Sequence, residues 1–148
     1  MVIDMELRKE LDKVVEDHRP ENLQELFSAI HVAELPFFSI LVKPTAIPWI
    51  IFIPKAPLTN TSAMLMLNGQ ILKIANGLQA QGRGHYNFAK IGNKSEWLHF
   101  HLVFRNENDE AWPDPIWCHE PLTENEHMAQ ALVKQIKIVL QDGDDTGI

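Results

Sequence analysis

Two histidines spaced one residue apart are the side chains of this sequence best placed to do chemistry together. His99 and His101 lie in the apolar stretch 97–103, whose alternation is typical of a half-buried β-strand. Because strand side chains alternate between two faces, both imidazoles are predicted on one face and Phe100 on the opposite, core-facing side. Three kinds of site fit such a pair: a metal site, a nucleophile with a helper group, or two hydrogen-bonded histidines without a chemical role.

The segments around this pair predict an α+β fold in which helices flank an antiparallel sheet. β-branched and aromatic runs predict four strands, of which the first two pair, at 37–42, 49–53, 86–89 and 97–104. Gly92–Ser95 is a turn-forming cluster that joins the last two strands.

Helical periodicity and capping residues predict the remaining elements. Apolar spacing predicts an N-terminal helix from Asp4 to about Asp17, with a short helical turn or connector at 20–27. The main packing helix is capped among 59–62 and ends at Gly82–Gly84. A last helix begins with a capping box formed by Thr123 and Glu126, and Asp142–Asp145 follows it as a frayed acidic tail.

Length and charge limit the classes of function. The 148 residues fit one domain, 1–148, in which residues 1–20 carry the extra N-terminal helix and residues 141–148 are the acidic tail. A formal charge of −7 argues against binding a nucleic acid or an anionic membrane. The apolar stretches fall short of the roughly 20 residues that span a bilayer. The acidic N-terminus does not resemble a secretory signal, and the lone Cys118 forms no internal disulfide, so we expect a cytoplasmic protein.

Several motifs stand in order around the histidine pair. They are Pro48-Trp-Ile-Ile-Phe-Ile-Pro-Lys55, the Gly92–Ser95 cluster, His99-Phe-His101 and Trp112-Pro-Asp-Pro-Ile-Trp117. Together they resemble the histidine triad (HIT) superfamily of nucleotide hydrolases and transferases. They are most similar to a bacterial branch with a shortened H-x-H motif and a W-P-x-P-x-W segment. The resemblance covers about residues 30–120.

The resemblance implies a HIT-like fold, normally a homodimer whose sheets join across a two-fold axis. It also implies a reaction at the α-phosphate of a nucleotide-like small molecule, without a metal or another cofactor. His99 would attack phosphorus and form a covalent nucleotidyl-histidine that water then opens. His101 would contact the phosphate oxygens or the leaving group, and its positive charge would favour the anionic transition state.

The resemblance also assigns the phosphate-binding residues. Asn87 and Asn93 match positions that hydrogen-bond phosphate, and Gly92 would let backbone N–H groups approach the oxygens. Lys94 lies beside this loop in the sequence and would add a local positive charge.

Two departures from the family pattern leave an alternative open. Trp97 stands where the branch usually has Gln, and we expect Trp97 and Trp49 to form walls of the pocket. Lys43 and Pro44 occupy the stretch where many relatives carry a ribose-binding carboxylate. The alternative function is therefore a catalytically degenerate, nucleotide-binding regulatory dimer. A metalloprotein that uses the H-x-H pair is a third class, disfavoured because the sequence offers no third ligand at a suitable spacing.

Overall fold

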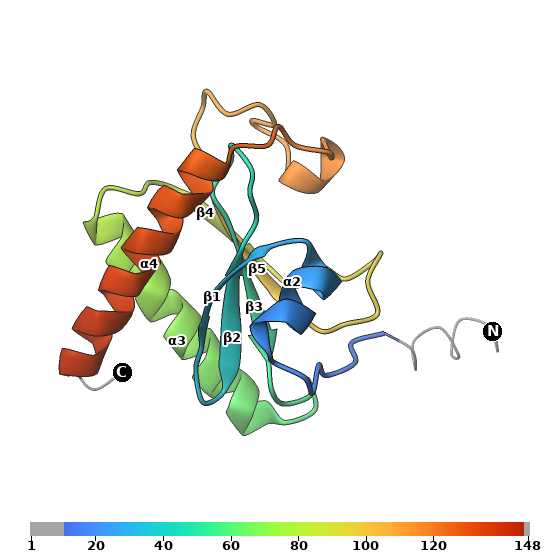
Figure 1. Cartoon of the computed structure of the whole chain (residues 1–148). Coiled ribbons are helices and arrows are strands. Elements are labelled where there is room, and N and C mark those ends of the chain that lie inside the picture. Colours follow the sequence, from blue (N-terminus) through green and yellow to red (C-terminus); the bar gives the residue numbers. More distant parts are fainter. Residues whose placement is uncertain (1–10, 147–148) are drawn as a thin grey trace.

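A five-stranded antiparallel sheet forms the centre of the computed structural model, which describes residues 11–146 (Figure 1). In chain order the elements are α2 (Pro20–Phe27), β1 (Ile30–Glu34), β2 (Phe38–Val42), β3 (Trp49–Pro54), α3 (Thr61–Ala80), β4 (Tyr86–Ala89), β5 (Phe100–Phe104), the 3₁₀ turn η1 (Ile116–Cys118) and α4 (Glu126–Thr146). The predicted α+β class is confirmed.

The sheet places β5, which contains His101, between β3 and β4. The strand order is β1-β2-β3-β5-β4, and every neighbouring pair is antiparallel. Ile51 of β3 and Ala89 of β4 lie opposite His101 on its two sides. The residues of β2, β3 and β5 are buried along their whole length. The backbone that carries the His101 imidazole is therefore fixed by a paired strand on each side.

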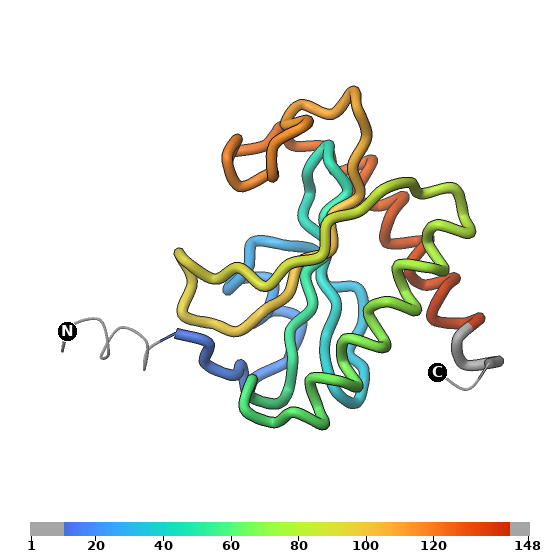
Figure 2. Tube along the Cα trace, turned by 180° about the vertical axis from the view of Figure 1, so that it is seen from behind, coloured from blue at the N-terminus to red at the C-terminus, as the bar shows by residue number. Residues whose placement is uncertain are grey.

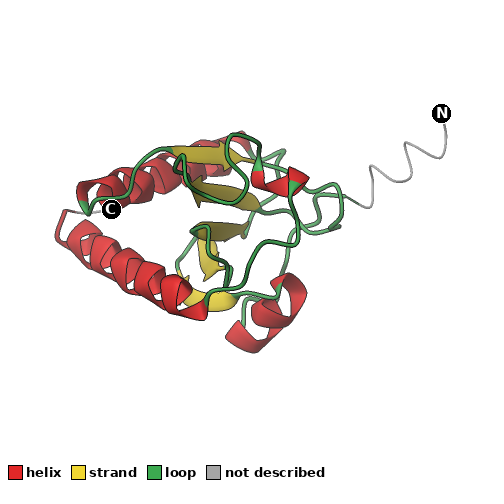
Figure 3. Cartoon of the chain, turned by 90° about the horizontal axis from the view of Figure 1, so that it is seen from above, coloured by secondary structure: helices red, strands yellow, loops and turns green. Residues whose placement is uncertain are grey.

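The two faces of the sheet are covered by different elements. Helices α3 and α4 lie side by side over one face, whereas α2 and the connecting loops lie over the other (Figures 1 and 3). Leu102 of β5 belongs to the core beneath α3 and α4, and Val103 belongs to the core on the α2 side. The predicted alternation of β5 side chains between two faces is confirmed.

The helix caps agree with the sequence at α3 and differ at α4. Asn60, one of the predicted capping residues, is the N-cap of α3. At α4 the side chain of Asn125 accepts the Met128 N–H at 3.0 Å, so the capping box predicted at Thr123 is wrong. The Thr123 hydroxyl instead donates to Glu110 at 3.0 Å, a partner that the local sequence does not supply.

Both ends of the described chain differ from the predictions. Residues 11–19 are not helical, and residues 4–10 of the predicted first helix lie outside the described residues. The residues 142–145, predicted as a frayed acidic tail after the last helix, belong to α4, which continues to Thr146. Val139 packs against α3 at Gly77 and anchors this end of α4 to the body of the protein.

Residues 11–19 run beside the loop that precedes β5, and Figure 2 shows the two segments next to one another. The Lys13 N–H donates to the Glu96 carbonyl at 2.9 Å, and the Leu98 N–H donates to the Lys13 carbonyl at 2.8 Å. Together these bonds form a parallel bridge between Lys13 and Trp97. The backbone of residues 12–14 is thereby used for tertiary pairing, which explains why the helical period does not produce a helix here.

A buried histidine fixes the same segment to the sheet. The Ser39 hydroxyl donates to Nδ1 of His18 at 2.7 Å, and Nε2–H of His18 donates to the Val15 carbonyl at 3.0 Å. Burial lowers the pKa of His18 and favours this neutral form. The N-terminal segment is therefore anchored to both β2 and the loop before β5.

Candidate active site

His99 and His101 form a close pair on the α2 side of the sheet. Their ring centres are 4.7 Å apart in an edge-to-face arrangement, and both side chains are buried. His101 lies within β5, whereas His99 lies just before the strand begins. The ring of Phe27, the last residue of α2, packs edge-on against His99 at 5.2 Å. The two imidazoles therefore lie close together on one face of the sheet, as predicted.

A backbone carbonyl determines the proton position of His99. Nδ1 of His99 lies 2.7 Å from the Trp97 carbonyl oxygen, and a carbonyl can only accept a hydrogen bond. Nδ1 therefore carries the proton, and Nε2 of the neutral ring keeps its lone pair. Burial lowers the pKa of His99, which favours this neutral ring at physiological pH. His99 thus has a nucleophilic nitrogen in a defined tautomer.

His101 has the opposite tautomer. The Trp49 Nε1–H donates to Nδ1 of His101 at 3.0 Å, and Nε2–H of His101 donates to the Ile91 carbonyl at 3.0 Å. An indole can only donate and a carbonyl can only accept, so both bonds require a neutral ring. Burial, reinforced by the neighbouring His99, lowers the pKa of His101 to about 4. The prediction that His101 carries a positive charge is therefore wrong, because its hydrogen bonds and burial favour the neutral ring.

The histidine pair opens on a pocket of about 420 Å³, within the size range of small-molecule sites. The loop 91–95 lines one part of it, including the predicted residues Gly92, Asn93 and Lys94. A Cβ atom at Gly92 would lie 4.0 Å from Cε1 of His99, so this glycine leaves the space beside the imidazole open. The structure therefore brings three predicted phosphate-binding residues to the His99 pocket.

The remaining lining of the pocket is mostly aromatic and apolar, with Ser28 and two further charged groups. Trp49 and Trp117 pack edge-to-face at 6.3 Å, and the Trp117 ring lies 4.9 Å from the His101 ring. Lys43 and Glu120 are the other charged residues of the lining. Glu120 approaches Lys94 at 3.9 Å, but the Lys94 side chain is 89% exposed, so solvent weakens this pair.

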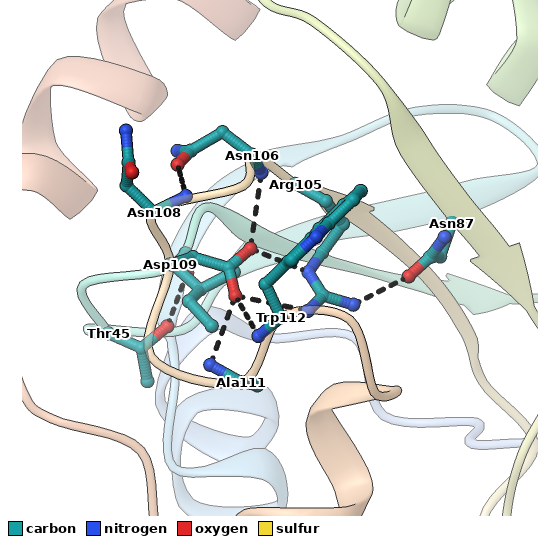
Figure 4. A network of polar contacts seen from close by, with 9 residues as sticks. Thr45, Asn87, Arg105, Asn106, Asn108, Asp109, Ala111 and Trp112 are labelled. Atoms are coloured by element: carbon teal, nitrogen blue, oxygen red, sulfur yellow. Dashed lines mark hydrogen bonds and ion pairs between the residues drawn. The ribbon is translucent and has the colours of Figure 1, made fainter.

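Two predicted site residues do not line the pocket. Asn87 belongs to a separate network, in which its Oδ1 accepts a hydrogen bond from Arg105 at 2.9 Å (Figure 4). Arg105 also forms a buried two-point ion pair with Asp109, at 2.8 and 3.1 Å. The Trp97 side chain packs against the core on the α2 side instead of walling the pocket. Its contribution to the site is the carbonyl that orients His99.

Sequence reasoning did not select several residues that the pocket contains. Phe27 comes from a segment without a recognisable motif, and Ile91 contributes a backbone carbonyl that no side-chain pattern reveals. Lys43 was noted only as a departure from the family pattern and was given no role in binding. Trp117 could have been selected from the sequence, because it ends the W-P-x-P-x-W segment. That segment serves the site through Trp117, whereas Trp112 lies over Arg105 with 5.7 Å between the guanidinium carbon and the ring centre.

Two kinds of feature are absent from residues 11–146. No three His, Cys, Asp or Glu side chains of this part of the chain come together as a potential metal site. Its helices also include none with the length and apolar character needed to cross a membrane.

Comparison with solved structures defines the class of fold. A histidine triad protein from Bradyrhizobium japonicum has a TM-score of 0.69 at 24% identity, covering 85% of this chain and 98% of its own. One from Sinorhizobium meliloti 1021 gives 0.68 at 24% identity, with the same coverage. One from Marinobacter aquaeolei VT8 gives 0.65 at 22% identity, covering 80% and 94%. Neither a family model nor a curated protein matches the sequence.

The chain therefore has the fold of histidine triad proteins. Within that fold, the two histidines of opposite tautomer and the pocket beside them form the candidate active site.

Proposed function

We propose that this protein is a nucleotide hydrolase or transferase of the bacterial HIT branch, which acts at the α-phosphate of a nucleoside phosphate compound. The observation that carries the proposal is the tautomer of His99. Its Nδ1–H is held by the Trp97 carbonyl, and its unprotonated Nε2 belongs to a side chain that lines the pocket. An imidazole nitrogen in this state is a competent nucleophile toward phosphorus.

The proposed reaction proceeds through a covalent nucleotidyl-histidine. The Nε2 lone pair of His99 forms a bond to the α-phosphorus while the bond from phosphorus to the leaving group breaks. The leaving group departs with that electron pair and takes a proton from water. A water molecule, or another acceptor hydroxyl in a transfer, then attacks phosphorus. The bond from phosphorus to Nε2 breaks and returns its electron pair to the neutral imidazole, and the proton of the attacking hydroxyl passes to the solvent. The Nδ1–H bond to the Trp97 carbonyl stabilises the positive charge that develops on His99.

The loop before β5 supplies the proposed phosphate contacts. Gly92, Asn93 and Lys94 line the pocket with His99, and they would offer backbone N–H groups, a side-chain amide and an ammonium to the phosphate. We assign His101 a positioning role, because both of its nitrogens are occupied by Trp49 and Ile91. It holds the strand end, the loop and the neighbouring imidazole in one arrangement.

A regulatory nucleotide-binding protein is the second candidate function. The neutral His101 supports it, because a ring with a pKa of about 4 that already donates to Ile91 is a poor acid for a leaving group. In that case the same pocket would hold a nucleotide without turnover.

Release of AMP separates the two candidates. The wild-type protein is incubated with adenosine 5′-phosphoramidate and with a diadenosine polyphosphate, and AMP is quantified by chromatography. We expect AMP release that is abolished by His99→Ala and retained in His85→Ala, which removes an exposed histidine outside the pocket lining. Absence of AMP above the His99→Ala level, together with calorimetric binding of AMP, would favour the regulatory protein.

We also propose a homodimer, in which the sheets of two subunits join. The support is the position of β4 at one edge of the sheet, with all four of its residues only half-buried. An exposed strand edge is a ready surface for pairing with a second chain. Light scattering after size exclusion should give twice the mass of one chain, and a monomer mass at micromolar concentration would contradict the proposal.

A further inference from the structure

Lys43 lines the candidate active-site pocket as a half-buried cation with little local neutralisation. Its ammonium donates to the Phe27 carbonyl and lies 5.4 Å from the centre of the Trp49 ring. Among the described residues, no carboxylate forms an ion pair with it. Glu120, the acidic residue of the same lining, forms an ion pair with Lys94 and acts on Lys43 only as a nearby charge, which partly offsets the effect of burial on the Lys43 pKa.

The hydrogen-bonding capacity of this ammonium exceeds what the protein supplies. An ammonium has three donors, of which one goes to the Phe27 carbonyl, while the Trp49 ring offers only its face. Burial lowers the pKa of Lys43, as expected for a cation that has lost part of its hydration. The bond to Phe27 at the end of α2 uses a single donor, so the other two donors of this ammonium have no hydrogen-bond acceptor among the described residues.

Lys43, which directly follows β2, and the loop 91–95, which precedes β5, both line the pocket. The indole edge of Trp49 donates to His101, whereas Lys43 lies over the face of the same indole. Phe27 presents its ring to His99 and its carbonyl to Lys43. Phe27 and Trp49 thus each contact both Lys43 and one histidine of the pair, and Lys43 reaches the pocket from a different part of the chain than the loop 91–95.

We propose that Lys43 is a specificity-determining residue that binds a second anionic group of the substrate, distinct from the phosphate that His99 attacks. The substrate class is then a phosphate compound that carries another phosphate or carboxylate group within reach of Lys43. As a statement about substrate, this inference rests on the proposed function. The contact between Lys43 and an anion is a binding property, so it can be measured without turnover.

The test compares anions of increasing length. Inorganic phosphate, pyrophosphate and tripolyphosphate are titrated calorimetrically into the full-length protein at constant ionic strength, which keeps screening equal. We expect the wild type to bind the best of the longer anions at least tenfold more tightly than phosphate, which corresponds to about 1.4 kcal/mol. In Lys43→Met this preference should fall below twofold, while binding of phosphate itself should change little.

Two further variants control the comparison. Lys43→Arg retains the cation and should retain most of the preference, and Lys73→Met removes an exposed lysine of α3 and should behave as wild type. Thermal unfolding confirms that each variant is folded, and Met keeps the apolar stem of the lysine.

The outcomes separate this inference from the proposed function. No preference in the wild type, a preference that persists in Lys43→Met, or an equal loss of affinity for all three anions would overturn the second anionic subsite. Failure to release AMP in the His99 experiment would overturn the proposed catalysis alone, because a Lys43-dependent preference would still stand as a property of the pocket.

Discussion

His99 and His101 lie on the same side of the sheet, yet the groups around them place the ring proton on Nδ1 of His99 and on Nε2 of His101. The Trp97 carbonyl places the proton of His99 on Nδ1, whereas the Trp49 indole excludes a proton from Nδ1 of His101. The difference decides their chemistry, because only His99 keeps an available Nε2 lone pair. His101, with both nitrogens occupied, is suited to holding the site together.

Substitution of Trp49 by Phe should raise the pKa of His101. The indole N–H stabilises the neutral ring by donating to Nδ1, and Phe removes that donor while keeping an aromatic ring. We expect the pKa to rise from about 4 while staying below 6.5, because burial remains, and we expect stability to fall by about 1 kcal/mol from the lost hydrogen bond. NMR titration of the imidazole nitrogens measures the pKa.

Trp117→Phe is the matched control for this prediction. Trp117 packs on His101 at 4.9 Å without a hydrogen bond to it, so this variant should leave the His101 pKa near its wild-type value. An unchanged pKa in Trp49→Phe, or equal increases in both variants, would show that the indole N–H does not control the protonation of His101.

The sequence could predict that the two histidines share a face, but not their tautomers. Period-two alternation depends on neighbouring residues, whereas Trp49 reaches His101 across 52 positions of the chain. Asn87 was misplaced for a similar reason, because Arg105, which directly follows the adjacent strand β5, donates to its side-chain oxygen. The tautomers and the role of Asn87 can be assigned only when the contacts between side chains distant in the sequence are known.

Among the elements, the segment 11–19 has a direct connection to the site. The backbone of Lys13 is hydrogen-bonded to Glu96 and Leu98, the residues before and after Trp97. The Trp97 carbonyl in turn orients His99. Asp12 also pairs with Lys90 at 2.7 Å, just before the pocket loop. An N-terminal segment outside the HIT resemblance therefore supports the loop that holds the proposed nucleophile.

Lys13→Pro should loosen this loop, because proline removes the N–H that donates to Glu96. Proline also disfavours the left-handed conformation of the preceding Asp12, whose φ is 58°. We expect the Leu98 amide, which donates to the Lys13 carbonyl, to exchange with deuterium roughly tenfold faster, as the loss of about one hydrogen bond would produce.

Lys13→Ala separates the backbone bonds from the side chain. It keeps both hydrogen bonds and removes only an exposed ion pair with Glu96 at 3.7 Å, so Leu98 exchange should change little. Equal exchange rates in Lys13→Pro and the wild type would show that the pairing does not hold the loop.

Element prediction succeeded where a local pattern and the tertiary environment agree. Strands β2 and β3 are apolar and buried along their length. Helix α3 begins at a predicted capping residue and buries four of its predicted apolar positions, namely Leu67, Ile71, Ile74 and Leu78. Strand β1 escaped detection because it is short and carries His31 and Glu34 within five residues. The predicted helix failed over 11–17, where the Lys13 backbone bonds to the loop before β5 and Asp12 has a left-handed conformation.

At the scale of the whole molecule, the charge of the pocket has the opposite sign to that of the chain. The chain carries a formal charge of −7, whereas the charged residues of the pocket lining are Lys43, Lys94 and Glu120, which sum to +1 with neutral histidines. Local donors, rather than attraction by the whole protein, must therefore bind an anionic ligand. We expect association rates without strong electrostatic steering.

Buried histidines should make the whole molecule less stable in mild acid. The folded-state pKa of His101 is about 4, below the ordinary value of 6.5, so between these two pH values the unfolded chain binds more protons than the folded chain. The free energy of unfolding should therefore decrease as the pH falls from 6.5 to 4, by about 3 kcal/mol from His101 alone. His18, His31 and His99 have pKa values shifted in the same direction and should add to the loss.

Urea unfolding at pH 7.5, 5.5 and 4.5 measures this dependence. His101→Asn retains a polar side chain that does not titrate, so its loss of stability between pH 7.5 and 4.5 should be smaller than that of the wild type by about 2 to 3 kcal/mol. His85→Asn, which removes an exposed histidine, should show the wild-type dependence. If His101→Asn loses as much stability as the wild type, His101 is not the buried neutral group that couples folding to pH, and the tautomer assigned from its two hydrogen bonds is wrong.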